Sequence, residues 1–162
     1  MFCFILDCPS GWTETASGCY KYFQDNDPYS VAKTFCEAQD SNSKLPSFKN
    51  ISVWNDFVGF VNADIGCTGK QVWIESESDS YYPSYYIKDW MGVFCKDPIS
   101  GVWASGEPTS PTTQRYTVKA VGTAETIATS SAGAVNRATV CQIPYFDACS
   151  KQLKLSGLND IL

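Results

Sequence analysis

The residues able to do chemistry in this sequence are carboxylates and cysteines, because the chain has no histidine. Without imidazole there is no Ser-His-Asp or Cys-His nucleophile, no imidazole proton shuttle and no His-ligated metal. Paired carboxylates still permit acid–base catalysis. A carboxylate-dependent glycosidase is therefore the lowest-ranked hypothesis, and we predict that the chain is not an enzyme.

An acidic run lies near the middle of the chain. Glu75, Glu77 and Asp79 alternate with serines, and carboxylate oxygens are the ligands that a hard cation such as calcium prefers. Most acidic side chains are exposed to solvent. We therefore expect a solvated acidic loop here rather than a cation site.

The cysteines favour disulfides over a metal site. They are even in number and no two have the C-x-x-C spacing, which is typical of disulfides in an oxidising compartment. A bridge between the second and third would staple an N-terminal hairpin. The eight are Cys3, Cys8, Cys19, Cys36, Cys67, Cys95, Cys141 and Cys149.

The cysteines also predict a secreted or extracellular protein. The sequon Asn50-Ile51-Ser52 supports this and makes Asn50 a candidate glycosylation site in a glycoprotein. Residues 1–6 are apolar but too short for a signal peptide and lack a basic start. We therefore expect either that the true start lies upstream or that the sequence is a fragment.

Composition excludes two classes of partner. The chain has 162 residues, enough for one domain, and a net charge of −5. It has no basic run that could neutralise phosphates, so nucleic acid is not expected as a partner. It has no apolar run long enough to span a bilayer.

Periodicity predicts two helices in the first half of the chain. Residues 28–40 form one, with Asp27 as its cap and Pro28 at its first position. Its expected core face is Val31, Ala32, Phe35 and Cys36. The second has the clearest amphipathic pattern in the chain. Its expected core residues are Val53, Trp54, Phe57, Val58 and Val61.

Strands are predicted mainly in the second half. Residues 19–23 form an early strand and residues 71–74 a buried one. Residues 75–115 have no steady period and are expected to be a long irregular loop. Further strands are expected at 116–121, 126–128 and 138–143, and a short helix in the tail at 150–162. Helices early and strands late indicate an α+β domain.

Several motifs in order carry a family resemblance. Cys8-Pro-Ser-Gly-Trp12 is followed by Gly18-Cys19-Tyr20, and Leu45-Pro-Ser-Phe48 leads into the second predicted helix. Val72-Trp-Ile74 is followed by Glu75 rather than glycine. Trp103-Ala-Ser-Gly-Glu-Pro108 and Ala138-Thr-Val-Cys-Gln142 complete the set. Together they resemble the C-type lectin-like domain family.

The resemblance implies a domain at residues 8–143, with an extension at 1–7 and a tail at 144–162. It implies a C-type lectin-like fold stapled by a Cys36–Cys141 disulfide. The family's second pair, in the late strands, is missing, and Thr117 stands near the place of its first cysteine. The sequence leaves the pairing of the other four cysteines open. One arrangement is a Cys67–Cys95 bridge that ties down the long loop and a Cys3–Cys149 bridge that joins the neighbouring termini.

The resemblance also locates the calcium and sugar ligands, most of which are absent. The family's Glu-Pro-Asn tripeptide is Glu107-Pro-Thr109 here, and its next glutamate is Arg115. Its Trp-Asn-Asp triplet corresponds to residues 127–131, which hold no carboxylate or amide. We predict no calcium and no other cofactor, with Glu107 paired to Arg115.

A tyrosine-rich segment is the expected ligand-binding surface, because aromatic rings stack on sugars and anchor protein contacts. About half of these rings are expected to pack inward instead. The predicted function is calcium-independent recognition of a glycan or a protein. The alternative is a true lectin with a non-standard site around Glu107. The candidate ligand-binding residues are Tyr81, Tyr82, Tyr85, Tyr86, Trp90, Glu107, Thr109 and Arg115.

Overall fold

Two helices and eight strands make up the part of the chain that the computed structural model describes. That part comprises residues 7–48, 50–63, 70–78, 85–88, 94–96, 103–106, 116–120, 127–130 and 137–145. The elements in order are β1 (Thr13–Thr15), β2 (Gly18–Asp27), α1 (Tyr29–Gln39), α2 (Ile51–Ala63), β3 (Gln71–Ser78), β4 (Tyr85–Lys88), β5 (Phe94–Lys96), β6 (Tyr116–Ala120), β7 (Ile127–Ser130) and β8 (Arg137–Pro144).

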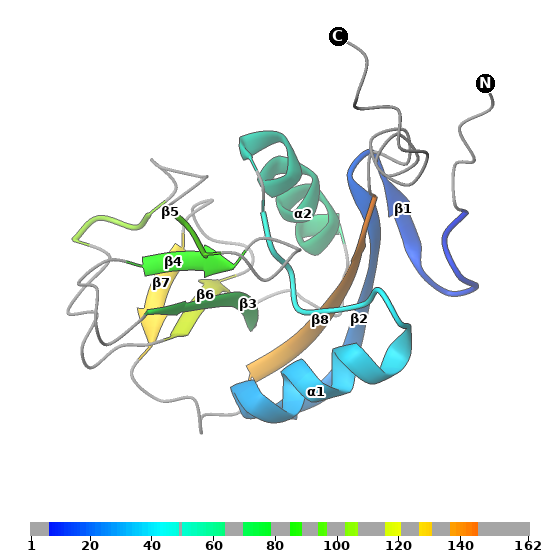
Figure 1. Cartoon of the computed structure of the whole chain (residues 1–162), viewed down its shortest axis with the longest axis horizontal. Coiled ribbons are helices and arrows are strands. Elements are labelled where there is room, and N and C mark those ends of the chain that lie inside the picture. Colours follow the sequence, from blue (N-terminus) through cyan, green and yellow to red (C-terminus); the bar gives the residue numbers. More distant parts are fainter. Residues whose placement is uncertain are drawn as a thin grey trace, which may run out of the picture.

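One sheet joins all eight strands. Its order is β1-β2-β8-β3-β4-β5, and β6 pairs with both β3 and β7. Every pairing is antiparallel except that of β3 with β8, recorded at Val72 and Ala138. Figure 1 shows the long β2–β8 pair between the two helices, with β3 to β7 gathered on one side. The architecture is the predicted α+β class.

Helix α1 differs from its prediction at both its cap and its buried face. The N-cap is Pro28 and no side chain caps the helix, so the prediction for Asp27 was wrong. Ala32 and Cys36 are buried as predicted and Phe35 is partly buried, but Val31 is 48% exposed and Tyr29 is buried in addition. Val31 lies two residues from Tyr29, about 200° round the helix. Burial of the large Tyr29 ring therefore turns Val31 toward solvent.

Helix α2 has the face that its sequence pattern predicts. All five expected core residues are buried, and Phe60 joins them. The helix packs into a cluster with residues of β2, β3 and β8, including Tyr20, Val72 and Val140. The local 3.6-residue period was sufficient here because one apolar stripe covers the helix from end to end.

A second cluster lies under α1. It contains Tyr29, Ala32, Cys36, Leu45, Trp73 and Cys141. The Cys36–Cys141 disulfide lies within it and links residues 105 positions apart. The other described disulfide, Cys8–Cys19, closes an 11-residue separation at the N-terminal hairpin. Cys95 lies in β5, whereas Cys3, Cys67 and Cys149 lie outside the described residues.

The hairpin of β1 and β2 packs against the end of β8. Gly18 has a positive φ, and a side chain there would collide with the carbonyl oxygen of Ile143. The Tyr145 backbone N–H donates to Ser17 at 2.9 Å, and the Tyr145 hydroxyl lies 3.5 Å from the sulfur of Cys8. The first and last described segments are therefore neighbours.

Gln142 ties the connector between the helices to the sheet. Its backbone exchanges two hydrogen bonds with Lys44, and its side-chain oxygen accepts from the Ser47 N–H at 2.9 Å. Its amide donates to the hydroxyl of Tyr20 at 2.9 Å. Burial raises the pKa of Tyr20 to about 12, so this hydroxyl stays neutral.

The segment expected to be an irregular loop contains regular structure. β3 continues from the predicted residues 71–74 to Ser78, and β4 and β5 follow it. The prediction of an irregular segment from residue 75 was therefore wrong for these parts. Their polar residues show no period, and they are strands because neighbouring strands supply the hydrogen-bond ladder. The predicted tail helix lies outside the described residues.

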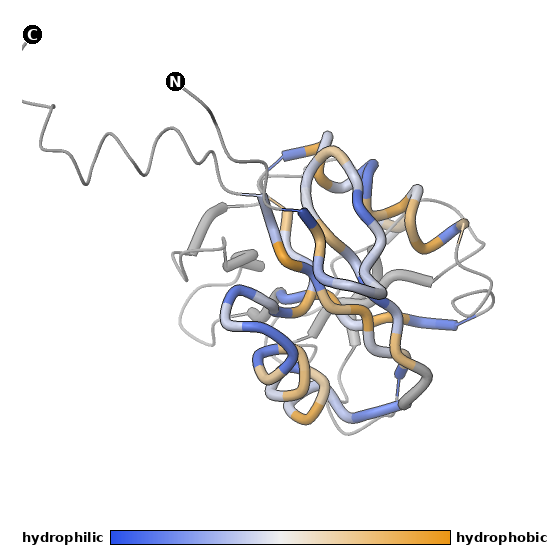
Figure 2. The backbone as a smooth tube through the Cα atoms, turned by 90° about the vertical axis from the view of Figure 1, so that its right-hand side faces the viewer, coloured by the Kyte–Doolittle hydropathy of each residue, from blue (hydrophilic) through white to orange (hydrophobic). Residues whose placement is uncertain are grey.

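No helix among the described residues is long and apolar enough to cross a membrane. Figure 2 shows that short hydrophobic and hydrophilic stretches follow one another along the described backbone. The burial found in both core clusters accounts for this pattern.

Candidate functional site

Most residues predicted to bind ligand lie outside the described part of the chain. Two of the tyrosines, Tyr85 and Tyr86, lie in β4, and that strand pairs with the end of β3. Tyr85 is opposite Ser78, and Tyr86 is opposite Glu77 on one side and Lys96 on the other. The outside residues are Tyr81, Tyr82, Trp90, Glu107, Thr109 and Arg115.

The far end of β3 is where the candidate segments join the sheet. Glu77 pairs with Tyr116 of β6, and Tyr116 pairs with Ser130 of β7. After Ser78 the chain leaves β3, contributes β4 and β5 to the same sheet, and enters β6 at Tyr116. Glu77, Tyr116 and Ser130 therefore lie in one row across β3, β6 and β7. This row is next to both ends of the 79–115 segment and includes the last residue of β7.

Trp103, four residues before Glu107, is packed against the core, whereas Ser105 and Gly106 are exposed. Trp103 is partly buried and packs against the cluster that contains α2. Gly106 has φ of 82°, a conformation that side-chain-bearing residues rarely adopt. Trp103 therefore holds the described stretch of residues 103–106 against the domain.

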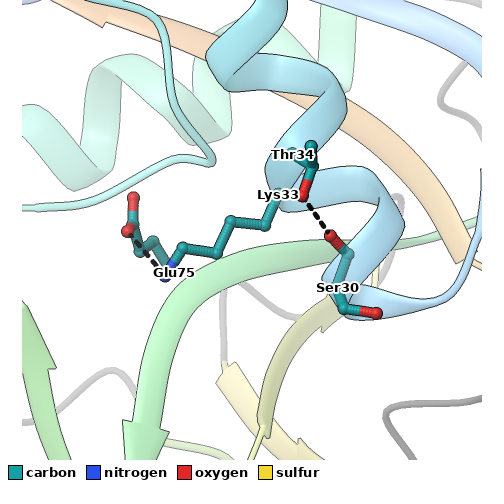
Figure 3. A network of polar contacts seen from close by, with 4 residues as sticks. All are labelled: Ser30, Lys33, Thr34 and Glu75. Carbon is teal, nitrogen blue, oxygen red and sulfur yellow. Dashed lines mark hydrogen bonds and ion pairs between the residues drawn. The ribbon is translucent and has the colours of Figure 1, made fainter.

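Glu75 is not the solvated residue that its acidic run predicts. It is 9% exposed, and its carboxylate lies 3.5 Å from the ammonium of Lys33 on α1 (Figure 3). On the same helix, the Thr34 hydroxyl donates a hydrogen bond to the backbone carbonyl of Ser30. The Glu75 N–H donates to the carbonyl of Pro46. The prediction was wrong because β3 continues through this position and places it under α1.

The sequence held one signal for the Lys33–Glu75 pair that our prediction missed. Glu75 stands where the resemblance leads one to expect glycine. Burial raises the pKa of Glu75 above its ordinary value, and the charge of Lys33 only partly opposes this. The Oε2 atom of Glu75 has no hydrogen-bond partner within the described residues. The carboxyl is therefore easier to protonate in the folded chain than in the unfolded one.

Glu75 is expected to make stability fall as pH rises above about 4.5, its ordinary pKa. The folded state holds this proton more tightly, so it binds more protons than the unfolded state between the two pKa values. The advantage of Glu75→Gln over the native chain should therefore grow with rising pH across that window. Chemical unfolding at a series of pH values measures it. Lys33→Met should steepen the native slope, and parallel profiles for Glu75→Gln and the native chain would contradict the assignment.

Asn50 immediately precedes α2 and is exposed. Its side-chain oxygen accepts from the Val53 N–H at 3.1 Å, and its carbonyl accepts from the Trp54 N–H at 3.3 Å. Ser52, the third residue of the sequon, is also exposed. Glycosylation uses the side-chain nitrogen of asparagine, so it does not compete with capping by the oxygen.

Asn50 is expected to carry a glycan when the chain passes through a eukaryotic secretory pathway. A mass loss on treatment with peptide-N-glycosidase measures this. Ser52→Ala should abolish the glycan while leaving the cap intact. Asn50→Asp should abolish it and keep the melting temperature, whereas Asn50→Ala should also lose about 1 kcal/mol of stability. Secreted chain without any such mass loss would show that the sequon is not used.

Known proteins resemble this chain in sequence over part of its length and in fold over most of it. No protein-family model matches the chain. The chain is 39% identical over 69 residues to snaclec botrocetin subunit alpha of Bothrops jararaca, which covers 42% of this chain and 52% of that protein. The chain spans about half the length of the curated relatives it matches.

Solved structures match over a larger share of the chain. The C-type lectin CEL-I from Cucumaria echinata matches with a TM-score of 0.67 and 18% identity, over 86% of this chain and 99% of that one. The C-type lectin domain of murine dendritic cell inhibitory receptor 2, solved in complex with N-glycan, has a TM-score of 0.66 and 15% identity, over 86% and 100%. This chain therefore has the fold of the C-type lectin domains, and part of its sequence is similar to snaclecs.

Proposed function

We propose that this chain is an extracellular, non-catalytic recognition domain that binds a glycan or a protein without calcium. The main support is that the chain has the fold elements of a C-type lectin-like domain but lacks most of the family's calcium ligands. The core clusters, the Cys36–Cys141 disulfide and the row Glu77, Tyr116 and Ser130 form the scaffold. At the family's calcium positions Glu107 keeps its carboxylate, but most of the other ligands are replaced.

The oxygen donors around β6 and β7 do not suit calcium. Calcium takes six to eight oxygens, many from carboxylates. β7 consists of Ile127, Ala128, Thr129 and Ser130, and Arg115 immediately precedes β6. A guanidinium repels a cation, and a hydroxyl at Thr109 replaces the usual amide.

Recognition is assigned to the segment that leaves β3 at Ser78 and returns at Tyr116. Tyrosines are concentrated there, and part of the segment forms strands β4 and β5 of the sheet. Similar solved domains include one in complex with N-glycan, which supports a glycan as one ligand class. Snaclec relatives support the extracellular assignment.

Calorimetric titration of calcium into the oxidised chain tests the calcium-independent part. We expect no binding heat and the same melting temperature in calcium and in chelator. Ligand capture from a glycan array, or a pull-down of a protein ligand, should likewise persist in chelator. Calcium binding in the millimolar range or tighter, with defined stoichiometry, would overturn this part of the proposal.

A second candidate is a lectin that uses Glu107 in a non-standard site. The anchoring of Trp103 in the core and the turn at Gly106 favour it, because they hold the start of this segment in place. Glu107→Ala should then abolish sugar binding without changing the melting temperature. Unchanged sugar binding by that variant would leave the tyrosine-rich segment as the site.

A further inference from the structure

A pocket of about 430 Å³ lies where β2 ends and β3 and β8 begin. Its volume falls in the range of about 300–1,000 Å³ that is usual for small-molecule sites. Its lining residues are Asn26, Lys70, Gln71, Arg137 and Ala138.

The strand pairings explain why the sheet is hollowed at this place. The β2–β8 register shifts between Phe23 and Asn26, and the ladder resumes with Asn26 opposite Ala138. Ala138 also forms the recorded parallel pair with Val72 of β3. Three strands therefore meet at one small residue, and alanine leaves space that a larger side chain would fill.

The lining is rich in hydrogen-bond donors and carries positive charge. Lys70 and Arg137 supply cationic N–H groups, and the amides of Asn26 and Gln71 both donate and accept. Among the described residues that line the pocket, none is acidic. Asp27 pairs with Arg137 in the β2–β8 ladder but does not line the pocket.

Aromatic rings position both cations. The guanidinium carbon of Arg137 lies 4.8 Å from the centre of the Trp73 ring, and the ammonium of Lys70 lies 5.9 Å from that of Tyr22. These contacts orient the two side chains. Burial lowers the pKa of Arg137 from its ordinary value, yet arginine stays protonated in proteins.

We propose that this pocket binds an acidic sugar unit, one that carries a carboxylate or a sulfate. The anion would lie against Lys70 and Arg137, since charge-assisted bonds from such donors are the strongest available. The amides of Asn26 and Gln71 would exchange hydrogen bonds with ring hydroxyls, which need partners that both donate and accept. A hollow that also offers amides suits a hydroxyl-bearing ring better than an extended acidic peptide.

This site is separate from the segment that carries the proposed function and does not depend on it. The pocket lies at Gln71, the first residue of β3, whereas the 79–115 segment leaves after Ser78. Seven steps along an extended strand span about 23 Å. The chain as a whole has a net charge of −5, so attraction of an anion has to come from local groups and should weaken with salt.

The test titrates the oxidised 162-residue chain with sulfated lactose, sialyllactose and neutral lactose. Backbone amide chemical shifts in NMR spectra monitor binding. Shifts are expected at Gln71 and Ala138 with either charged sugar, and the tighter of the two identifies the preferred anion. Lys70→Met should weaken binding about tenfold or more, the usual cost of losing one charged hydrogen-bond partner.

Lys21→Met is the matched control, because Lys21 also lies over a ring of β2, at 5.3 Å from Phe23, but does not line the pocket. It should bind charged sugars as the native chain does, and the unliganded spectra show whether each variant is folded. Equal binding of neutral lactose, equal loss in both lysine variants, or no shift with either charged sugar would overturn the proposal. Tighter binding of a tetraglutamate peptide than of either charged sugar would overturn the sugar assignment.

Discussion

Removing the Cys36–Cys141 disulfide with the double variant Cys36→Ala/Cys141→Ala should cost about 4–5 kcal/mol of unfolding free energy. The bridge joins residues 105 positions apart, and a cross-link over so long a loop restricts the unfolded chain strongly. Both half-cystines are fully buried between α1 and β8, so the variant also loses packing there. Guanidinium unfolding of the two oxidised proteins measures the difference.

The matched control is Cys8→Ala/Cys19→Ala. This bridge closes a separation of only 11 residues at the hairpin, so its removal should cost about 3 kcal/mol on the same model. Both double variants leave an even number of cysteines. If both double variants lost the same unfolding free energy, or the hairpin variant lost more, the larger stabilisation assigned to the Cys36–Cys141 bridge would be contradicted.

Replacing Trp73 with alanine should destabilise the domain by about 3–5 kcal/mol. The side chain is fully buried in the cluster under α1 and contacts Tyr29 edge to face, with ring centres 5.5 Å apart. Its indole N–H donates to the carbonyl of Asp27 at 2.9 Å, which joins the start of β3 to the end of β2. Thermal and chemical unfolding measure the loss.

Trp73→Phe separates packing from hydrogen bonding. It keeps an aromatic ring in the cluster and beneath Arg137 but loses the N–H, so it should cost about 1–3 kcal/mol. It should also keep more of the binding of charged sugars than Trp73→Ala does. If the two variants were equally destabilised, the hydrogen bond to Asp27 rather than the packing would dominate.

The scaffold of the candidate site was predictable where the signal is local. The α2 face was correct because five apolar residues share one stripe, and the β8 strand because residues 138–143 form a continuous β-rich run. The 79–115 segment was identified by its tyrosines, but its strands were not. A polar strand such as β4 exists because β3 and β5 pair with it, and that information is not in its own residues.

The sequence by itself determined the absence of imidazole chemistry, the α+β class, the C-type lectin-like resemblance and the departures at Thr109 and Arg115. These follow from residue type and order, which do not depend on folding. Only the tertiary structure decided that Val31 faces solvent and that Glu75 is buried against Lys33. It alone brought Lys70 and Arg137 to one pocket. Burial and charge proximity depend on which elements pack together, and residues distant in the chain meet only when the sheet forms.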